Sequence, residues 1–320
     1  MQVAVIIPCY NNAATVRVAV ESALAQEGVA LEVVVVDDGS TDGSVEKLAP
    51  LGDRVRVIRQ ENAGACVARN RGLAETTAQL VKFLDADDVL EPSCLKSQLA
   101  QAEHAGPETV VFGRGLWITP EGRKVGAYPS VPMEDGTVLS VADLITASPL
   151  TTCPLHRREL LDAIDGFDSD CPRGQEHDLH IRLGIAGARL TFHDTLCYRY
   201  IQHVGEARIS ARQRSRNVCA AQIEVYDRQF AMARDRGLID YEEGALRQPF
   251  ARHFWRHGRV CGRAGHDDLA ARCFARSDEI AGGKGRGAVG SPPYRLLARL
   301  LGGTKIEALE RLRSPQDRIG

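Results

Sequence analysis

The sequence lacks several features that would assign it to a specialised class of protein. Its 320 residues contain no apolar run near the ~20 residues that a membrane-spanning helix requires. Basic residues number 40 and acidic residues 42, so the formal net charge is −2 and no nucleic-acid partner is expected. No internal repeat is present. Hydrophobic residues (44%) and charged residues (26%) stand at ordinary proportions, which indicates a globular chain of one large domain or two smaller ones.

The nine cysteines include no CxxC pair, and their odd number argues against a disulfide framework or a zinc site. We interpret them as small buried hydrophobic residues in a reducing cytosol. Because residues 1–5 lead directly into a predicted strand, no signal peptide is expected. The sequence therefore predicts a cytoplasmic protein.

Strand-like and helix-like segments alternate over the first 115 residues. Short apolar runs predict buried strands at residues 3–7, 33–36, 55–58, 80–84 and 110–112. Helices are predicted at residues 16–24, 44–48 and 65–75, and from Pro92 onward. This βαβα order predicts an α/β fold with a doubly wound, mostly parallel sheet and right-handed crossovers.

The rest of the chain is predicted to become helical. Residues 116–150 are rich in Pro, Gly and Ser and are expected to form an irregular connection. After them we expect short strands at 152–156, 190–192 and 198–201, and helices at 158–164 and 175–186. An Arg-rich helical part is predicted from about 210 to 280, then a linker at 282–293 and a tail helix at 294–313.

Polar residues follow three of the predicted strands at the point where each strand ends. They are Asn11, Asp38 and the sequence Asp85-Ala86-Asp87. Because ligands of doubly wound sheets bind beyond the carboxyl ends of the strands, these residues are candidates for one site.

Clustered carboxylates suggest a metal ion. Carboxylates at a strand end repel one another, and a divalent cation such as Mg²⁺ or Mn²⁺, bound also by substrate phosphates, removes that cost. A lone Asp-x-Asp is more often a solvated turn, here with Asp88 as a helix N-cap. The second acidic turn, Asp37-Asp38, makes the metal interpretation stronger. Gly64 at a helix start and Arg69 are the candidate partners for phosphate.

Four motifs resemble family 2 glycosyltransferases with the GT-A fold. They are Ile6-Ile7-Pro8-Cys9-Tyr10-Asn11, Val36-Asp37-Asp38-Gly39-Ser40-Thr41-Asp42, Asn62-Ala63-Gly64 with Ala68-Arg69-Asn70-Arg71-Gly72, and Phe83-Leu84-Asp85-Ala86-Asp87-Asp88. The resemblance covers roughly residues 1–210. It implies a nucleotide-diphosphate sugar donor, a divalent metal and inversion at the anomeric carbon.

The resemblance also implies roles for individual residues. Pro8, Tyr10 and Asn11 would border the nucleotide, and Asp38 would contact the base or ribose. Further donor contacts would come from Arg69, near the base or phosphates, and from Asp85, on the ribose. Asp87 would bind the metal ion, Mn²⁺ or Mg²⁺, that joins the two phosphates.

An inverting transfer needs a base for the acceptor hydroxyl. Family members usually carry a Glu-Asp or Gln-Asp pair before an aromatic residue and Asp-Leu. This chain has Gln175-Glu176-His177-Asp178-Leu179, so Glu176 stands where the basic Asp usually stands, and His177 departs from the aromatic. Glu176 is the predicted base and Asp178 the fallback. Without the other motifs, a carboxylate interacting with the helix dipole would be the simpler interpretation.

Several other residues are weaker candidates. Gly166-Phe167-Asp168 matches a turn that commonly precedes the base and could border the acceptor. Arg199 and Arg208 could each contact the diphosphate or form a surface salt bridge. His203 is a possible metal ligand, although a lone histidine is more often structural. Three aromatic residues are interpreted as packing residues rather than sugar platforms: Trp117, Tyr226 and Trp255.

The domain organisation follows from these motifs. We predict a catalytic domain at residues 1–210, with a donor half at 1–115 and an acceptor half at 116–210, and a helical extension at 211–320. Residues 281–320 carry 8 basic and 3 acidic side chains, with leucines beside the arginines. This tail could lie on the inner face of an anionic membrane or pack against the protein or another subunit.

The predicted function is transfer of a sugar to a glycan or lipid-linked acceptor in surface polysaccharide or glycolipid synthesis. A sugar-1-phosphate nucleotidyltransferase would carry a Gly-rich loop with a basic residue after the first strand, where this chain has Pro8-Cys9-Tyr10-Asn11. A phospho-receiver module would leave the cluster at residues 85–88 and the segment 150–210 unexplained. A sugar-nucleotide-binding module without transfer activity is the remaining alternative.

Overall fold

The computed structural model of the chain describes residues 1–119, 121–201, 215–239 and 245–313. These residues form two compact units. The first unit takes the described residues of segments 1–140, 147–169 and 175–206, and the second those of segments 141–146, 170–174 and 207–320.

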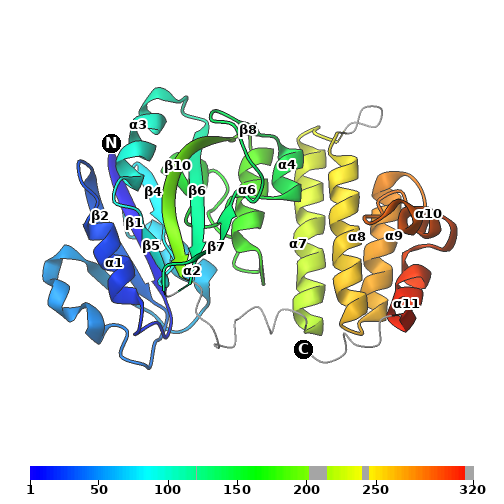
Figure 1. Cartoon of the computed structure of the whole chain (residues 1–320), viewed down its shortest axis with the longest axis horizontal. Coiled ribbons are helices and arrows are strands. Elements are labelled where there is room, and N and C mark those ends of the chain that lie inside the picture. The colour runs from blue at the N-terminus through cyan, green and yellow to red at the C-terminus, as the bar shows by residue number, and fades with distance from the viewer. Residues whose placement is uncertain (120, 202–214, 240–244, 314–320) are drawn as a thin grey trace. The chain divides into compact units, whose positions relative to one another are not determined.

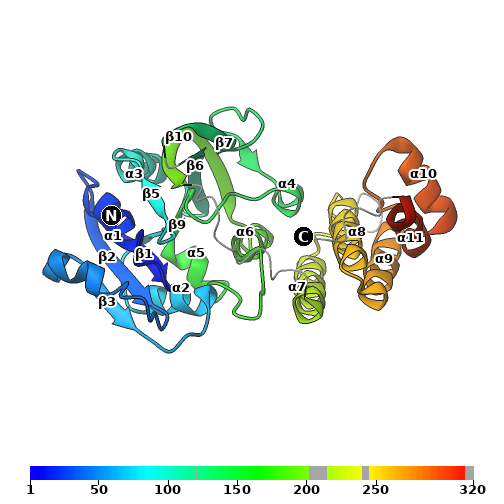
Figure 2. The same ribbon diagram turned by 60° about the horizontal axis from the view of Figure 1, so that its bottom comes forward.

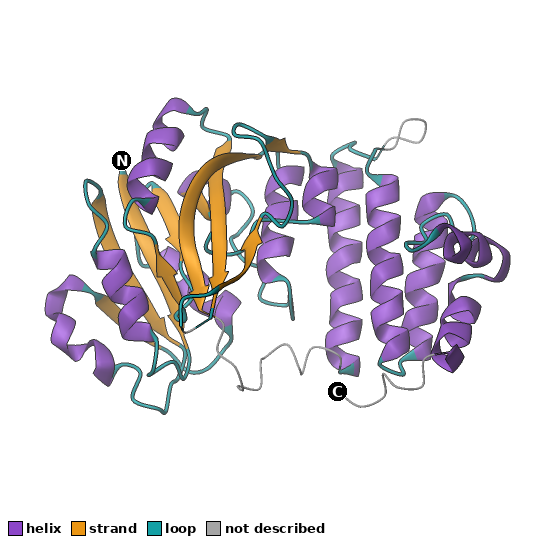
Figure 3. Ribbon diagram, viewed as in Figure 1, coloured by secondary structure: helices purple, strands orange, loops and turns teal. Residues whose placement is uncertain are grey.

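The first unit is built on a ten-stranded sheet (Figures 1 and 3). Its strands are β1 (Gln2–Cys9), β2 (Ala30–Asp37), β3 (Arg56–Arg59), β4 (Leu80–Phe83), β5 (Asp88–Leu90), β6 (Thr109–Ile118), β7 (Lys124–Tyr128), β8 (Val138–Leu139), β9 (Pro154–Arg157) and β10 (Arg189–Ile201). The strand order is β3-β2-β1-β4-β9-β6-β10-β5, with β7 beside β6 and β8 beside β10.

The half of the sheet that begins the chain is parallel. Strands β3, β2, β1 and β4 run in one direction, and Val5 of β1 lies between Val33 of β2 and Lys82 of β4. Beyond β4 the sheet is mixed: β9 is antiparallel to both β4 and β6, while β6 and β10 are parallel. The predicted doubly wound, mostly parallel sheet is therefore confirmed. The parallel half also brings the ends of β1, β2 and β4 to one edge.

Helices cover the faces of this sheet. They are α1 (Val16–Leu24), the 3₁₀ helix η1 (Glu46–Arg54), α2 (Ala65–Ala74), α3 (Cys94–His104), α5 (Arg158–Asp162) and α6 (Gln175–Ile185). Helix α2 lies against β1 and β2 because Gly72 has no side chain: a Cβ there would be 2.4 Å from Ile6 Cγ2. This close approach fixes the position of the arginine-bearing helix relative to the strand ends.

Two predictions for the middle of the chain are wrong. Residues 116–150 are not irregular throughout, since they contain the end of β6, strands β7 and β8, and helix α4 (Val141–Thr146). The strands predicted at 190–192 and 198–201 are one strand, β10, which has register irregularities between Phe192 and Tyr198. Partners distant in the sequence stabilise these strands, and local composition does not reveal them.

The second unit is helical, in agreement with the helical C-terminal region predicted from the sequence. Besides α4 it contains α7 (Arg216–Asp235), α8 (Arg247–Arg263), α9 (Asp267–Ala281), α10 (Pro292–Leu301) and α11 (Gly303–Arg313). Buried Trp255 and Phe274 lie with ring centroids 4.7 Å apart, and Tyr226 packs on His253 and Phe254, so the packing role predicted for Trp255 and Tyr226 is confirmed. The predicted single tail helix is two helices, separated at Gly302 with φ 85°.

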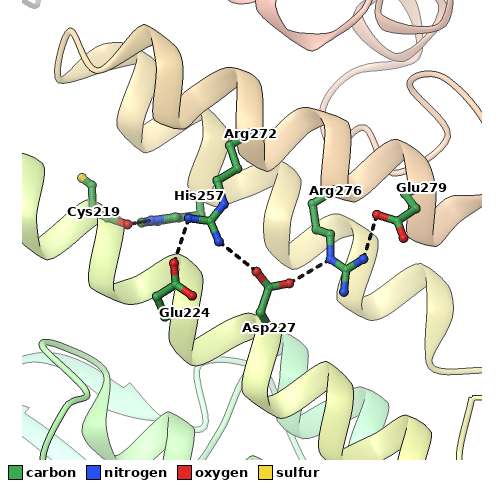
Figure 4. A network of polar contacts seen from close by, with 7 residues as sticks. All are labelled: Cys219, Glu224, Asp227, His257, Arg272, Arg276 and Glu279. Atoms are coloured by element: carbon green, nitrogen blue, oxygen red, sulfur yellow. Dashed lines mark hydrogen bonds and ion pairs between the residues drawn. The ribbon is translucent and has the colours of Figure 1, made fainter.

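Ion pairs join the outer faces of α7 and α9 (Figure 4). Arg272 lies 2.8 Å from Glu224 and 3.3 Å from Asp227, and Arg276 lies 2.8 Å from Asp227. None of the described helices is both long and apolar enough to span a bilayer.

Candidate functional site

The turn after β1 is fastened to the turn after β2. The Asn11 N–H donates to Ser40 Oγ at 2.9 Å, and the Thr41 N–H donates to Asn11 Oδ1 at 2.9 Å. Asn11 has a φ of 53°, a left-handed conformation that asparagine tolerates better than most residues. Tyr10 beside it is half exposed. The first two predicted polar clusters thus form one continuous turn structure.

Asp38 holds the loop that leads into α2. Its buried carboxylate accepts hydrogen bonds from the backbone N–H groups of Ala63 and Gly64, at 2.9 and 2.8 Å, and from Gln60 Nε2 at 2.8 Å. In this structure Asp38 therefore orders the Asn62-Ala63-Gly64 motif. The predicted contact of Asp38 with base or ribose stays a prediction.

Arg69 connects two of the predicted motifs. From the buried side of α2, its Nη2 donates to Asp85 Oδ1 at 2.7 Å and its Nη1 donates to Gln175 Oε1 at 2.9 Å. The guanidinium lies over the Phe167 ring, 5.1 Å from the centroid, and its Nε is buried without a hydrogen-bond partner. Arg69 thus joins the acidic turn after β4 to the beginning of α6.

Asn70, the next residue of α2, fixes the turn at Gly166-Phe167-Asp168. Its Nδ2 donates to the Phe167 carbonyl at 2.7 Å, and its Oδ1 accepts from the Phe167 N–H at 2.9 Å. The Phe167 ring in turn packs edge-on against Phe83 of β4. One short motif therefore positions both the acidic turn and the turn that precedes α6.

The acidic turn has a chemistry that fits a divalent cation. Asp88 is buried; Thr152 Oγ1 donates to its Oδ2 at 3.0 Å, while its Oδ1 has no partner. Burial, together with the charges of Asp85 and Asp87, raises the pKa of Asp88. An unpartnered buried oxygen among three neighbouring carboxylates is a donor set that Mg²⁺ and Mn²⁺ accept.

A cavity of about 350 Å³ lies where these elements meet. Its lining residues are Arg69, Asp85, Asp88, Trp117, Leu150, Thr151, Thr152, Glu176, Tyr198 and Tyr200. Three of the predicted site residues line this cavity: Arg69, Asp85 and Glu176. The other predicted site residues do not line it: Pro8, Tyr10, Asn11, Asp38, Asp87 and Asp178.

Seven of the ten lining residues were not predicted as site residues: Asp88, Trp117, Leu150, Thr151, Thr152, Tyr198 and Tyr200. Trp117, interpreted as a packing residue, lies against Gly126, where a Cβ would be 2.0 Å from its ring, and it also lines the cavity. Tyr198 and Tyr200 are two residues apart on β10, and this spacing puts both side chains on one face of a strand. The spacing was the feature of the sequence that could have predicted that they act together.

Glu176 is a carboxylic acid whose ionisation the site disfavours. Burial is the main cause of its raised pKa, and the charge of Asp85 adds to it, while Arg69 acts in the opposite direction. A carboxylate that is held in this way accepts a proton more readily than an exposed one. Glu176 thus has the property of a general base at the cavity wall.

Asp178 has different surroundings. It is buried and accepts a hydrogen bond of 2.7 Å from Arg182 Nε. The other nitrogens of Arg182 donate to the carbonyls of Ile164 and Gly166. The pair therefore ties α6 to the preceding turn.

The remaining weak candidates divide into two groups. Arg199 forms a salt bridge with Glu91, with 2.6 Å between Arg199 Nε and Glu91 Oε1. His203 and Arg208 lie outside the described residues.

A second group of possible metal ligands lies in the helical unit, where Cys219, His257 and Cys261 bring their ligand atoms within 4.8 Å of one another. Both ring nitrogens of His257 are engaged. Nδ1 contacts Arg173, and Nε2 contacts the Cys219 carbonyl, as Figure 4 shows. This arrangement satisfies the imidazole without an ion.

The sequence matches known proteins over much of its length. Residues 4–162 match the family model described as Glycosyl transferase family 2. The succinoglycan biosynthesis protein ExoO of Rhizobium meliloti is 30% identical over 240 residues, which cover 71% of this chain and 68% of that protein. Three further glycosyltransferases, from Escherichia coli and two Rickettsia species, match over only 27% to 37% of their own lengths.

Solved structures share the fold. Staphylococcus aureus TarS 1-349 in complex with UDP-GlcNAc aligns with a TM-score of 0.58 at 18% identity, over 99% of this chain and 93% of that chain. The mannosyltransferase PcManGT from Pyrobaculum calidifontis, in complex with GDP-Man and Mn²⁺, aligns with a TM-score of 0.55 at 18% identity. That alignment covers 97% of this chain and 87% of the mannosyltransferase. At these identities the likeness concerns the fold.

Proposed function

The chain belongs to glycosyl transferase family 2 and has the GT-A fold, and on that premise we propose that it is an inverting glycosyltransferase. It moves a sugar from a nucleotide-diphosphate sugar to a hydroxyl group of a glycan or lipid-linked acceptor. The observation that carries this proposal is the cavity in which Arg69 joins Asp85 to Gln175 beside Glu176.

In the proposed reaction the acceptor oxygen attacks the anomeric carbon from the face opposite the leaving group. A bond forms between these two atoms while the bond from the anomeric carbon to the diphosphate oxygen breaks. The Glu176 carboxylate takes the proton of the hydroxyl, and the nucleoside diphosphate leaves with the bonding electrons. The raised pKa of Glu176 makes its carboxylate a better proton acceptor than that of an exposed glutamate. Asp178, which is paired with Arg182, is the less suitable base.

The acidic turn is the proposed cation site. Asp87, with Asp88, would hold Mn²⁺ or Mg²⁺, and the unpartnered oxygen of Asp88 supports this assignment. The ion would neutralise the charge of the departing diphosphate. The Mn²⁺ bound to the structurally similar mannosyltransferase agrees with this choice of cofactor.

The nucleotide is assigned to the edge formed by the ends of β1, β2 and β4. Pro8, Tyr10 and Asn11 would border it, Asp38 would contact base or ribose, and Asp85 the ribose. The support for this is topological, since the three strand ends are neighbours in the parallel half of the sheet. The UDP-GlcNAc and GDP-Man bound to the two similar structures agree with a nucleotide-sugar donor.

The proposed process is synthesis of a surface polysaccharide or glycolipid, which the similarity to the succinoglycan protein supports. The proposed location is the cytoplasm. All nine cysteines lie within the described residues, are buried and form no disulfide, as proteins in a reducing compartment allow.

The test is donor turnover by the full chain with UDP-, GDP-, dTDP- and CMP-sugars, with and without Mn²⁺. We expect one nucleotide class to be hydrolysed or transferred, and Glu176→Gln to retain donor binding and lose transfer by about 10²-fold or more. Near-normal transfer by Glu176→Gln would disprove the base assignment. Donor binding without turnover in the wild type would favour a sugar-nucleotide-binding module. Release of pyrophosphate from a nucleoside triphosphate would favour a nucleotidyltransferase.

A further inference from the structure

The helical unit contains a cavity of about 550 Å³ that is lined by basic side chains and by no acidic one. Its cationic lining residues are Arg252, Lys284, Arg286, Arg295 and Arg299. They come from α8, from the glycine-rich segment 282–287 and from α10. Positive charges gathered around one cavity repel one another, and an anionic ligand offsets that repulsion.

Other arginines of the helical unit are paired with carboxylates, whereas the described residues provide no such partner for the arginines of this cavity. Arg272 and Arg276 form ion pairs with carboxylates of α7 and α9 (Figure 4), and Arg216 pairs with Asp268. Within the described part of the chain, no carboxylate lies within 4.0 Å of the guanidinium groups of Arg252, Arg286, Arg295 and Arg299. Their charges are therefore available to a ligand from outside the chain.

The glycine-rich segment is held firmly against α10. The Gly285 N–H donates to Asp278 Oδ1 at 2.6 Å, and a Cβ at Gly285 would lie 2.5 Å from the Ala298 carbonyl. Lys284 Nζ donates to the Leu300 carbonyl at 2.9 Å. The cavity is thus built from parts whose backbone positions are fixed, which lowers the entropic cost of binding.

Helix α10 carries an exposed apolar face beside its arginines. Leu296 and Leu300 are 59% and 65% exposed, and Leu297 is 39% exposed, while Tyr294 and Ala298 are buried. In both views α10 lies on the opposite side of α8 and α9 from α7 (Figures 1 and 2). Because successive helical residues are about 100° apart, leucines 296 and 300 flank arginines 295 and 299 along the helix.

We propose that this cavity and the three leucines form a docking face for an anionic phospholipid bilayer. The lining cations take lipid phosphate groups, and the leucines enter the interface between headgroups and acyl chains. A soluble phosphate would use the cations and leave the leucines in water, so the joint arrangement favours a bilayer. The docking needs no sugar donor and is tested separately from the proposed catalysis.

The test is co-sedimentation of the full chain with vesicles of phosphatidylcholine alone and of phosphatidylcholine mixed equally with phosphatidylglycerol. We expect binding to the anionic vesicles only, weakened by added salt. Each arginine near the surface contributes a factor of about five, so the pair Arg295→Gln and Arg299→Gln should weaken binding about 20- to 30-fold. Leu296→Ser with Leu300→Ser should also weaken it by at least about tenfold.

The matched control is Arg216→Gln with Arg234→Gln, which removes the same charge from exposed, paired arginines of α7. It should change vesicle binding less than about twofold. Equal loss in the control, equal binding to uncharged vesicles, or unchanged binding by the leucine variant would each overturn the docking face. Binding of inorganic pyrophosphate without vesicle binding would overturn it too and would identify a soluble ligand. Circular dichroism of each variant shows that it is folded.

Discussion

Arg69 and Asp85 meet through a hydrogen bond of 2.7 Å between the Arg69 Nη2 and the Asp85 Oδ1, although they are sixteen positions apart in the chain. The second nitrogen of the same guanidinium reaches Gln175, the first residue of α6. One side chain therefore sets the position of the acidic turn relative to the helix that carries Glu176.

Arg69→Lys should lower kcat/KM by about 10- to 100-fold. Lysine keeps the positive charge, but a single ammonium cannot reproduce the planar fork that joins both partners. Steady-state donor turnover measures the effect. Arg71→Lys is the control, since Arg71 lies on the same helix and pairs with Glu75 at the surface. Equal losses in the two variants would show that the bridge has no special role.

Asp178→Asn should destabilise the chain by about 3 to 5 kcal/mol, because it removes a buried carboxylate and leaves Arg182, whose side chain is only 14% exposed, without its anionic partner. Glu176→Gln should be neutral or stabilising, because it removes a carboxylate whose ionised form burial disfavours. Urea unfolding at neutral pH compares the two. If Glu176→Gln were the more destabilising variant, Glu176 and not Asp178 would be the carboxylate that stabilises the fold.

The acidic limb of the kcat/KM profile should lie above pH 4.5, the ordinary pKa of glutamic acid. A base acts in its ionised form, and burial together with Asp85 raises the pKa of Glu176, so activity is lost on acidification earlier than for an exposed glutamate. Turnover measured from pH 4 to 8 locates the limb, and the residual rate of Glu176→Gln should not show it. A wild-type rate that stays constant down to pH 4.5 would contradict the assignment.

Acid should also destabilise the fold through the pair His156 and His180. Their ring nitrogens Nε2 lie 3.2 Å apart, and burial, followed by the charge of Lys82, lowers the pKa of His156 from 6.5 to about 3. Burial likewise lowers the pKa of His180. Between about pH 3 and pH 6.5 the imidazole of His156 is protonated in the unfolded chain but not in the folded chain. The stability of the fold therefore falls as the pH falls below 6.5.

For one imidazole the loss between pH 7.5 and 5 is about 2 kcal/mol. Urea midpoints at pH 7.5 and 5 measure it, and His156→Gln should reduce the difference between them. His104→Gln, at an exposed position of α3, should leave the difference unchanged. A stability that is equal at both pH values in the wild type would refute the prediction.

The sequence alone was enough to determine the parallel half of the sheet and the edge at which its polar residues gather. Apolar runs at β1, β2 and β4 are long enough to be buried strands, and their order with intervening helices allows one handedness of connection. Asn11, Asp38 and Asp85 follow those strands, so local pattern and topology together placed them on one edge. The motif spacing also indicated the family to which the chain belongs.

Only the tertiary structure decided which of these side chains share a cavity and which are held by partners from other segments. Asp38 is engaged by backbone groups of Ala63 and Gly64, and Asp178 by Arg182, whereas Asp85 and Glu176 face the cavity with Arg69. A carboxylate's role depends on its burial and on partners from distant segments, and neither is a property of local sequence. The cavity wall at Trp117 and the unpaired arginines around α10 arise for the same reason, since packing between elements determines them.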